Sequence, residues 1–238
     1  MLDRSGKPCD AHSLVTFLVG PDPNPMKFLI HKEVVCHHSE VLAAAFNSSF
    51  QEGQTQTYRI EDTTERAFKL FTQWLYSRRL MLQQPFVSDA TGYEKNDQED
   101  QEDHEDQEQF MIELDEDMSL VELWVLADKF GMPLLQNDVL DSIHLILEDP
   151  EGQLPVQTFP YIFENTTPGS LLREYTISMC VRYMEPEALN QFDENFPRDL
   201  LFGMSLKYME LKEVVDVSKD GNEDKNSNAL VVSDFYAK

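Results

Sequence analysis

The stretch from Phe28 to Gly53 constrains the fold more than any other part of this sequence. Its first residues have the composition of a strand, and His31-Lys-Glu-Val-Val-Cys36 leads directly into a helical turn. Ser39 is a suitable N-cap for a short helix over Glu40–Phe46, and Phe50 begins a further turn. Three short elements of mixed type in so few residues predict a fold that combines a sheet with helices.

Apolar spacing on either side of this stretch predicts more strands and a longer helix. Val15–Val19 is a β-branched and aromatic run that suits a buried strand, and it should form a hairpin with the strand that includes Phe28. Thr55–Ile60 alternates like a half-exposed strand, and Asp62 with Glu65 three residues later predicts a helix start. The apolar face of that helix is expected to hold Ala67, Phe71, Trp74 and Leu75.

A helical pair is predicted farther along the chain. Ser119 and Glu122 have the capping-box spacing, which predicts a helix over Leu120–Phe130. Gly131 can end this helix, and Pro133 suits the first turn of the next one. The positions expected in the core are Leu120, Leu123, Trp124, Ala127, Phe130, Leu135, Val139, Ile143 and Ile146.

An acidic run separates these two regions. Tyr93–Gln109 contains nine acidic residues and one basic residue, Lys95. Like charges at this density resist packing, so we expect a solvated, disordered insertion over about residues 83–114. The run lacks the glycine that an EF-hand calcium loop requires at its turn. Attraction of a basic partner is an alternative role for the run.

The charge balance excludes several function classes. Lys and Arg total 19 against 44 Asp and Glu, a net charge of -25, which disfavours binding to nucleic acid or to an anionic membrane. The three cysteines (Cys9, Cys36 and Cys180) are widely spaced, which suits a reducing compartment, the cytoplasm or the nucleus. We expect no signal peptide and no membrane helix, because no apolar run approaches the ~20 residues needed to span a bilayer.

The remaining segments are expected at the two ends of the chain. Residues 1–13 should form a flexible arm, and residues 213–238 a flexible tail, except that Ala229-Leu-Val-Val232 could dock as a strand or as a peptide. Residues 151–212 should form a helical extension, with helices over Ser170–Met184 and Asp199–Leu211.

Candidate chemical groups have structural roles that account for them. Cys36-His37-His38 suggests metal binding, but adjacent side chains diverge and no second ligand cluster follows at a usable spacing, so we expect no metal. His31-Lys32 suggests an acid/base pair, yet no nucleophile or carboxylate partner is identifiable nearby, and a half-buried His31 bonded to a backbone group is expected instead. No phosphate-binding or nucleophile-elbow motif occurs, so no cofactor and no enzymatic activity is expected.

The order of these elements resembles a BTB/POZ domain over residues 14–147. The resemblance is carried by Val15-Thr-Phe-Leu-Val-Gly20, the His31-Lys32 pair, Phe71-Thr-Gln-Trp-Leu-Tyr76 and Leu123-Trp-Val-Leu-Ala-Asp-Lys-Phe130. It implies an α/β (α+β) fold, a small sheet flanked by helices, that works by presenting surfaces to other proteins. The C-terminal helices resemble the extension found in uncharacterised fungal BTB-domain proteins.

The resemblance also implies a partner-binding position. Phe50-Gln51-Glu52 occupies the place of the apolar-x-acid motif with which some BTB domains bind cullin scaffolds. An exposed aromatic anchor beside a charge that fixes register accounts for such a motif physically. The alternative is that Phe50 covers the domain core and Glu52 is solvated.

Three function classes follow, in order of preference. The first is an adaptor of a cullin-type ubiquitin ligase, in which the helical extension or the tail holds a client. The second is a non-ligase scaffold or transcriptional co-factor that self-associates through the BTB core. The third, an enzyme, has no catalytic constellation to support it.

Residues 1–13 contain Gly6 and Pro8 and cannot supply the swapped N-terminal helix of many dimeric BTB domains, so we expect a monomer or a weak dimer.

Overall fold

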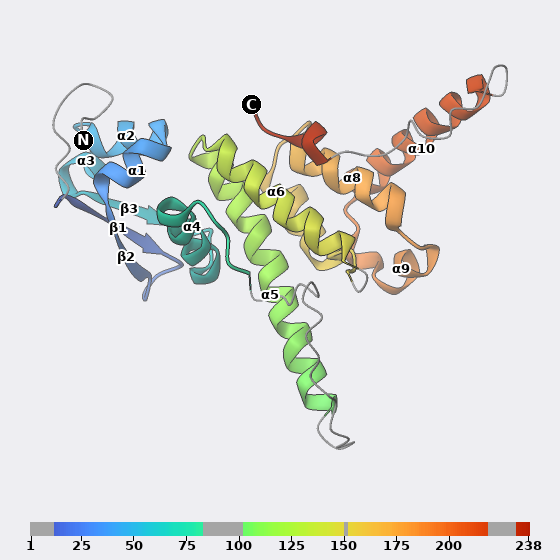
Figure 1. Ribbon diagram of the computed structural model, residues 1–238, viewed down its shortest axis with the longest axis horizontal. Helices are drawn as coiled ribbons and strands as arrows, with labels where there is room; N and C mark the ends of the chain where they lie inside the picture. The colour runs from blue at the N-terminus through green and yellow to red at the C-terminus, as the bar shows by residue number, and fades with distance from the viewer. Residues whose placement is uncertain (1–11, 83–101, 150–151, 219–231) are drawn as a thin grey trace. The chain divides into compact units, whose positions relative to one another are not determined.

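The computed structural model describes residues 12–82, 102–149, 152–218 and 232–238 (Figure 1). Within these ranges it contains three strands, ten α-helices and three short 3₁₀ helices, which is an α+β fold. The chain divides into two compact units, residues 1–83 with 119–139 and residues 84–118 with 140–238.

The first unit contains a three-stranded sheet in the order β2-β1-β3. The central strand β1 (Leu14–Val19) pairs antiparallel with β2 (Met26–His31), so that Phe17 lies opposite Phe28. It pairs parallel with β3 (Thr57–Ile60) on its other side. The predicted hairpin is therefore confirmed, and the parallel pairing requires the long crossover connection that the intervening helices provide.

One face of β1 is buried, because side chains alternate along a strand. Val15, Phe17 and Val19 are buried, whereas Leu14 is 44% exposed. The expectation of a buried strand therefore holds for alternate positions of β1. β3 is shorter than expected, because Gln56 has a left-handed backbone with a φ of 51° and ends the preceding helix.

Four helices complete the N-terminal part of this unit. They are α1 (Lys32–His38), α2 (Glu40–Asn47), α3 (Gln51–Thr55) and α4 (Glu65–Ser77). Ser39 caps α2 as predicted, since its hydroxyl accepts a hydrogen bond from the Leu42 N–H at 3.0 Å. The predicted cap of α4 is wrong: Thr64, not Asp62, accepts from the Ala67 N–H, because its side chain stands one residue before the first turn.

Aromatic rings form the core of the first unit. Phe17 on β1 lies 5.6 Å from the Phe46 ring and 5.2 Å from the Phe68 ring, measured between centroids. Phe130 lies 5.7 Å from both Tyr58 and Phe71. The predicted core positions of α4 (Ala67, Phe71, Trp74 and Leu75) are all buried. The same holds for Leu120, Leu123, Trp124, Ala127 and Phe130. Burial of this apolar surface is the main stabilising contribution to the unit.

The helix before Phe130 is longer than the sequence predicted. α5 spans Glu102–Lys129, so the backbone of residues 102–114 is helical, and the predicted unstructured insertion is wrong for them. Residues 83–101 of that insertion lie outside the described residues, as do residues 1–11 of the expected arm. The acidic composition did not exclude a helix, because glutamate and glutamine have good helix propensity.

Ser119 and Glu122 therefore lie inside α5, and their predicted role as a capping box is wrong. Glu122 instead accepts hydrogen bonds from Thr64, at 2.9 Å from its N–H and 2.6 Å from its hydroxyl. The Glu122 side chain thus completes the N-terminus of α4 across 58 residues of sequence.

The turn between α5 and α6 matches the prediction. Gly131 has a φ of 61°, a conformation that favours glycine, and α6 (Pro133–Glu148) begins at Pro133. The Ser39 hydroxyl donates to the Phe130 carbonyl at 2.7 Å, which holds the end of α5 against the start of α2. Leu135 and Val139 of α6 are buried as expected, whereas Ile143 and Ile146, also expected in the core, are only half-buried.

The second unit is helical. Its main elements are η1 (Val156–Thr158), α7 (Phe159–Asn165), α8 (Leu171–Tyr183), α9 (Pro186–Gln191), η2 (Asp193–Asn195), α10 (Arg198–Ser218) and η3 (Val232–Phe235). Helices α8 and α10 lie side by side, and Gly203 allows their approach, because a Cβ there would lie 2.4 Å from the Ile177 Cδ1. These are the two helices predicted for the extension.

Side-chain contacts fix the turn between α7 and α8 and the last residues of this unit. The buried Arg173 donates to the carbonyls of Phe163 and Thr166, which fixes the turn between α7 and α8. Phe235 packs on the Tyr175 ring at 5.5 Å, and Tyr236 donates to the Asp141 carboxylate. Residues 235–236 therefore differ from the flexible tail expected there, and residues 229–231 lie outside the described chain.

No helix in the described ranges combines the length and the apolar character that a bilayer crossing requires.

Candidate partner-binding surface

Phe50 is presented to solvent at the start of α3. Phe50 is 74% exposed, the largest exposed fraction among the large hydrophobic residues of the described ranges. The alternative that Phe50 covers the core is therefore wrong. Glu52, in the first turn of the same helix, is half-buried.

The backbone around Phe50 is fixed by local hydrogen bonds. The Phe50 N–H donates to the Ser48 hydroxyl at 3.1 Å, and that hydroxyl donates to the Ala45 carbonyl at 2.8 Å. The Gln54 N–H donates to the Phe50 carbonyl at 3.0 Å. An aromatic side chain on a backbone held in this way loses little conformational freedom when it binds a partner.

Gly53 allows α3 to pack closely against the end of α2. A Cβ at this position would lie 1.9 Å from the Ser48 carbonyl oxygen. The obstructing atom belongs to the backbone, so it cannot move aside as a flexible side chain could. The glycine therefore sets the position of Phe50 relative to α2.

We expect Gly53→Ala to lower the free energy of unfolding by ~1–3 kcal/mol, the usual cost of overpacking. Urea denaturation of the full chain measures this change. Gln51→Ala is the matched control, because Gln51 is an exposed residue of the same helix and its replacement adds no such contact. Equal stability of the two variants would contradict the steric role of Gly53.

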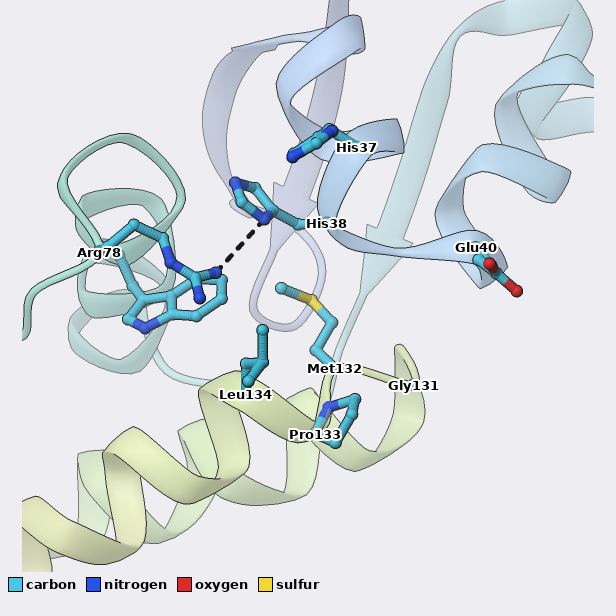
Figure 2. Close-up of a pocket in the computed structure, with 9 residues that line it drawn as sticks. His37, His38, Glu40, Arg78, Gly131, Met132, Pro133 and Leu134 are labelled. Carbon is cyan, nitrogen blue, oxygen red and sulfur yellow. Dashed lines mark hydrogen bonds between the residues drawn. The ribbon is translucent and has the colours of Figure 1, made fainter. Parts of the chain in front are cut away.

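A second candidate site in this unit is a cleft of about 540 Å³ (Figure 2). Its walls come from α1 and the start of α2, the end of α4, and the start of α6 with the turn before it. It is lined by His37, His38, Glu40, Trp74, Arg78, Gly131, Met132, Pro133 and Leu134. This volume is in the range typical of ligand-binding pockets. Phe50 is not among the lining residues.

Three side chains of this cleft contact one another. The Arg78 guanidinium lies 3.8 Å from the centre of the buried Trp74 ring, and the His38 ring meets the same tryptophan edge-on at 5.3 Å. Nη1 of Arg78 lies 3.4 Å from Nδ1 of His38 (Figure 2). Because arginine only donates, this contact is a hydrogen bond only when Nδ1 of His38 carries no proton.

The pKa of His38 is lowered from its ordinary value. Partial burial is the largest cause, followed by the positive charge of Arg78 and by His37, and a hydrogen bond to the Leu75 backbone opposes them. Glu40 is the acidic residue that lines the same cleft, and its carboxylate points away from His38 in Figure 2.

This lowered pKa predicts a loss of stability in mild acid. As the pH falls below the ordinary histidine pKa, His38 is protonated in the unfolded chain but not in the folded chain. The free energy of unfolding therefore decreases until the pH reaches the pKa of His38 in the folded chain. Melting temperatures between about pH 7.5 and about pH 5.5 bracket that window. We expect His38→Gln to reduce the slope of the melting temperature against pH. His12 is an exposed histidine outside the cleft, so His12→Gln should keep the wild-type slope. Parallel slopes for all three proteins would contradict the prediction.

The other candidate groups have different surroundings from those expected. Nδ1 of His31 lies 2.8 Å from the Tyr76 hydroxyl, so the prediction of a backbone partner for the His31 ring is wrong. The side chain of the adjacent Lys32 donates a hydrogen bond to the Phe46 carbonyl. Burial raises the pKa of the Cys36 thiol, and raises that of Cys180 to about 12. In the described ranges no group of three or more His, Cys, Asp or Glu side chains is placed to hold a metal ion.

Sequence reasoning missed the cleft. Trp74 was predicted as a core residue, which it is, but its spacing does not reveal that Arg78 covers its ring. Arg78 follows the last turn of α4 with a φ of 58°, and no local pattern indicates that conformation for an arginine.

Residues 3–97 match the sequence model of the BTB/POZ domain family. The match covers all three strands and helices α1 to α4, and it begins inside the segment expected to form an arm. The match and the small sheet with its flanking helices together support a BTB/POZ domain in this part of the chain. No curated protein matches the chain. BTB/POZ domains are generally protein–protein interaction modules rather than enzymes, so the surfaces around Phe50 and Arg78 are the sites of interest.

Proposed function

We propose that this protein is an adaptor of a cullin-type ubiquitin ligase, with Phe50 as the aromatic anchor for the cullin. The observation that supports the proposal is the 74% exposure of Phe50 on a backbone fixed by Ser48 and Gln54, with Glu52 in the first turn of the helix that follows. Exposed aromatic side chains on rigid elements are typical binding anchors, and a neighbouring carboxylate orients the partner.

The proposal divides the chain into a BTB/POZ domain over residues 14–147, which holds the cullin, and a helical extension over residues 151–212, which holds a client. As part of this proposal, the extension is similar to that of fungal BTB-domain proteins. The proposal also places the protein inside the cell, in the cytoplasm or nucleus, where the free thiols of Cys36 and Cys180 suit a reducing environment.

Titration calorimetry with an N-terminal fragment of a cullin tests the proposal directly. We expect saturable binding by the full chain with a dissociation constant below about 10 µM, a value within reach of a standard interface. Light scattering of the free chain over a dilution series should give the mass of one protomer at low concentration. No heat at tens of micromolar, together with a stable dimer, would remove the adaptor proposal and favour a self-associating scaffold.

A further inference from the structure

We propose that the cleft beside Trp74 binds a short acidic peptide segment of a partner protein, and that Arg78 pairs with a carboxylate of that segment. This site is separate from the surface around Phe50. The proposal depends on how Arg78 is held, on its lack of an acidic partner among the described residues, and on the apolar side chains opposite it.

Arg78 is held ready for a ligand by its own helix. Its N–H donates to the Trp74 carbonyl at 2.9 Å, which closes the C-terminus of α4, and its guanidinium lies flat on the tryptophan ring. Stacking on an aromatic face leaves the outer edge of the guanidinium free to donate two parallel hydrogen bonds to a carboxylate. An arginine fixed in this way loses less conformational freedom on binding than a mobile one.

The surrounding charges favour an anionic ligand at Arg78. Ion pairs of this unit include those of Arg59 with Asp22 and Glu61, of Lys69 with Glu65, and of Lys129 with Asp62. None of these described pairs includes Arg78, although the chain carries a net charge of -25. His37 and His38 line the cleft beside Arg78, and neither side chain brings a negative charge to this side.

The opposite wall favours a peptide over a small anion. Figure 2 shows the side chains of Met132 and Leu134 pointing toward Arg78 and His38, and Pro133 lies between them in sequence. Leu134 is 60% exposed, so it offers apolar surface to a ligand. Glu40 stands at the far edge of the opening and would repel a second carboxylate there. The best ligand therefore carries one Asp or Glu next to an apolar side chain.

The test uses the full chain and fluorescein-labelled octapeptides that place one Asp beside one Leu or Phe. Each peptide has a matched copy in which Asn replaces Asp. We expect the acidic copies to bind roughly tenfold to hundredfold more tightly in fluorescence anisotropy, the value of a hydrogen bond to a charged group. Arg78→Asn should remove this preference, since asparagine tolerates the left-handed backbone at this position.

Two control variants show whether the preference for acidic peptides arises at this cleft. Arg79→Asn removes an adjacent, exposed arginine that does not line the cleft, and it should keep the preference. Phe50→Ala should keep it as well, which distinguishes the cleft from the proposed cullin contact. Equal binding of acidic and amide copies by the wild-type chain would overturn the proposal. So would an unchanged preference in a correctly folded Arg78→Asn variant, checked by its melting temperature.

Discussion

Trp74→Ala is expected to lower the free energy of unfolding by ~3–5 kcal/mol, the usual range for deleting a buried aromatic side chain. The Trp74 side chain is only 1% exposed, and its Nε1 donates to an Asp138 carboxylate oxygen at 2.6 Å. Alanine would leave a cavity between α4 and α6 and would remove the donor from that carboxylate. It would also remove the ring on which Arg78 and His38 rest.

Urea denaturation followed by circular dichroism measures this change, because it does not depend on tryptophan fluorescence. Trp74→Phe is the matched variant: it keeps most of the ring but not the N–H donor. We expect this variant to lose about 1.5–3 kcal/mol of the free energy of unfolding, the usual contribution of a hydrogen bond to a charged group. A midpoint for Trp74→Ala within error of the wild type would show that the ring contributes little to the core.

Phe50→Ala should weaken binding of a cullin N-terminal fragment by roughly thirtyfold to a thousandfold, equivalent to ~2–4 kcal/mol for the loss of an interface anchor. The melting temperature should stay unchanged, because the Phe50 side chain is 74% exposed in the free chain. Glu52→Gln should have a smaller effect that depends on salt, since a rim charge mostly changes the association rate.

Calorimetry on matched variants separates an anchor from a general loss of apolar surface. Phe202 on α10 is 64% exposed and lies in the other unit, so Phe202→Ala removes a comparable ring without touching the proposed contact. We expect this variant to bind the cullin fragment as the wild type does. If Phe50→Ala bound equally well, the cullin contact would have to lie elsewhere on the domain.

Apolar spacing predicted the buried positions of β1, of α4 and of the last turns of α5, because the contacts there repeat with the period of each element. The faces that hold Phe71 and Trp74 in α4, or Leu123 and Ala127 in α5, follow from periods of 3.6 residues. Ser39 was also predicted as a cap, because its hydrogen bond to Leu42 is local in sequence.

The errors share a physical cause. The contacts of Glu122 with Thr64 and of His31 with Tyr76 join residues 58 and 45 positions apart, so no local pattern could indicate them. The start of α5 at Glu102 was missed because charge density was given more weight than helix propensity. Phe50 was found as a candidate only through the resemblance to BTB domains, since its exposure is not encoded in spacing.

The hydroxyl of Ser39 and the carboxylate of Glu122 have a consequence for how the chain folds. Their hydrogen bonds join residues that are 91 and 58 positions apart in sequence. The end of α5 and the start of α4 therefore gain these hydrogen bonds only when distant segments of the chain meet. Such nonlocal closure slows folding and makes it cooperative. A protein truncated at residue 97, where the family match ends, would lack Phe130 and Glu122, and its aromatic core would stay incomplete. Expression of the domain in isolation should therefore extend at least through residue 139.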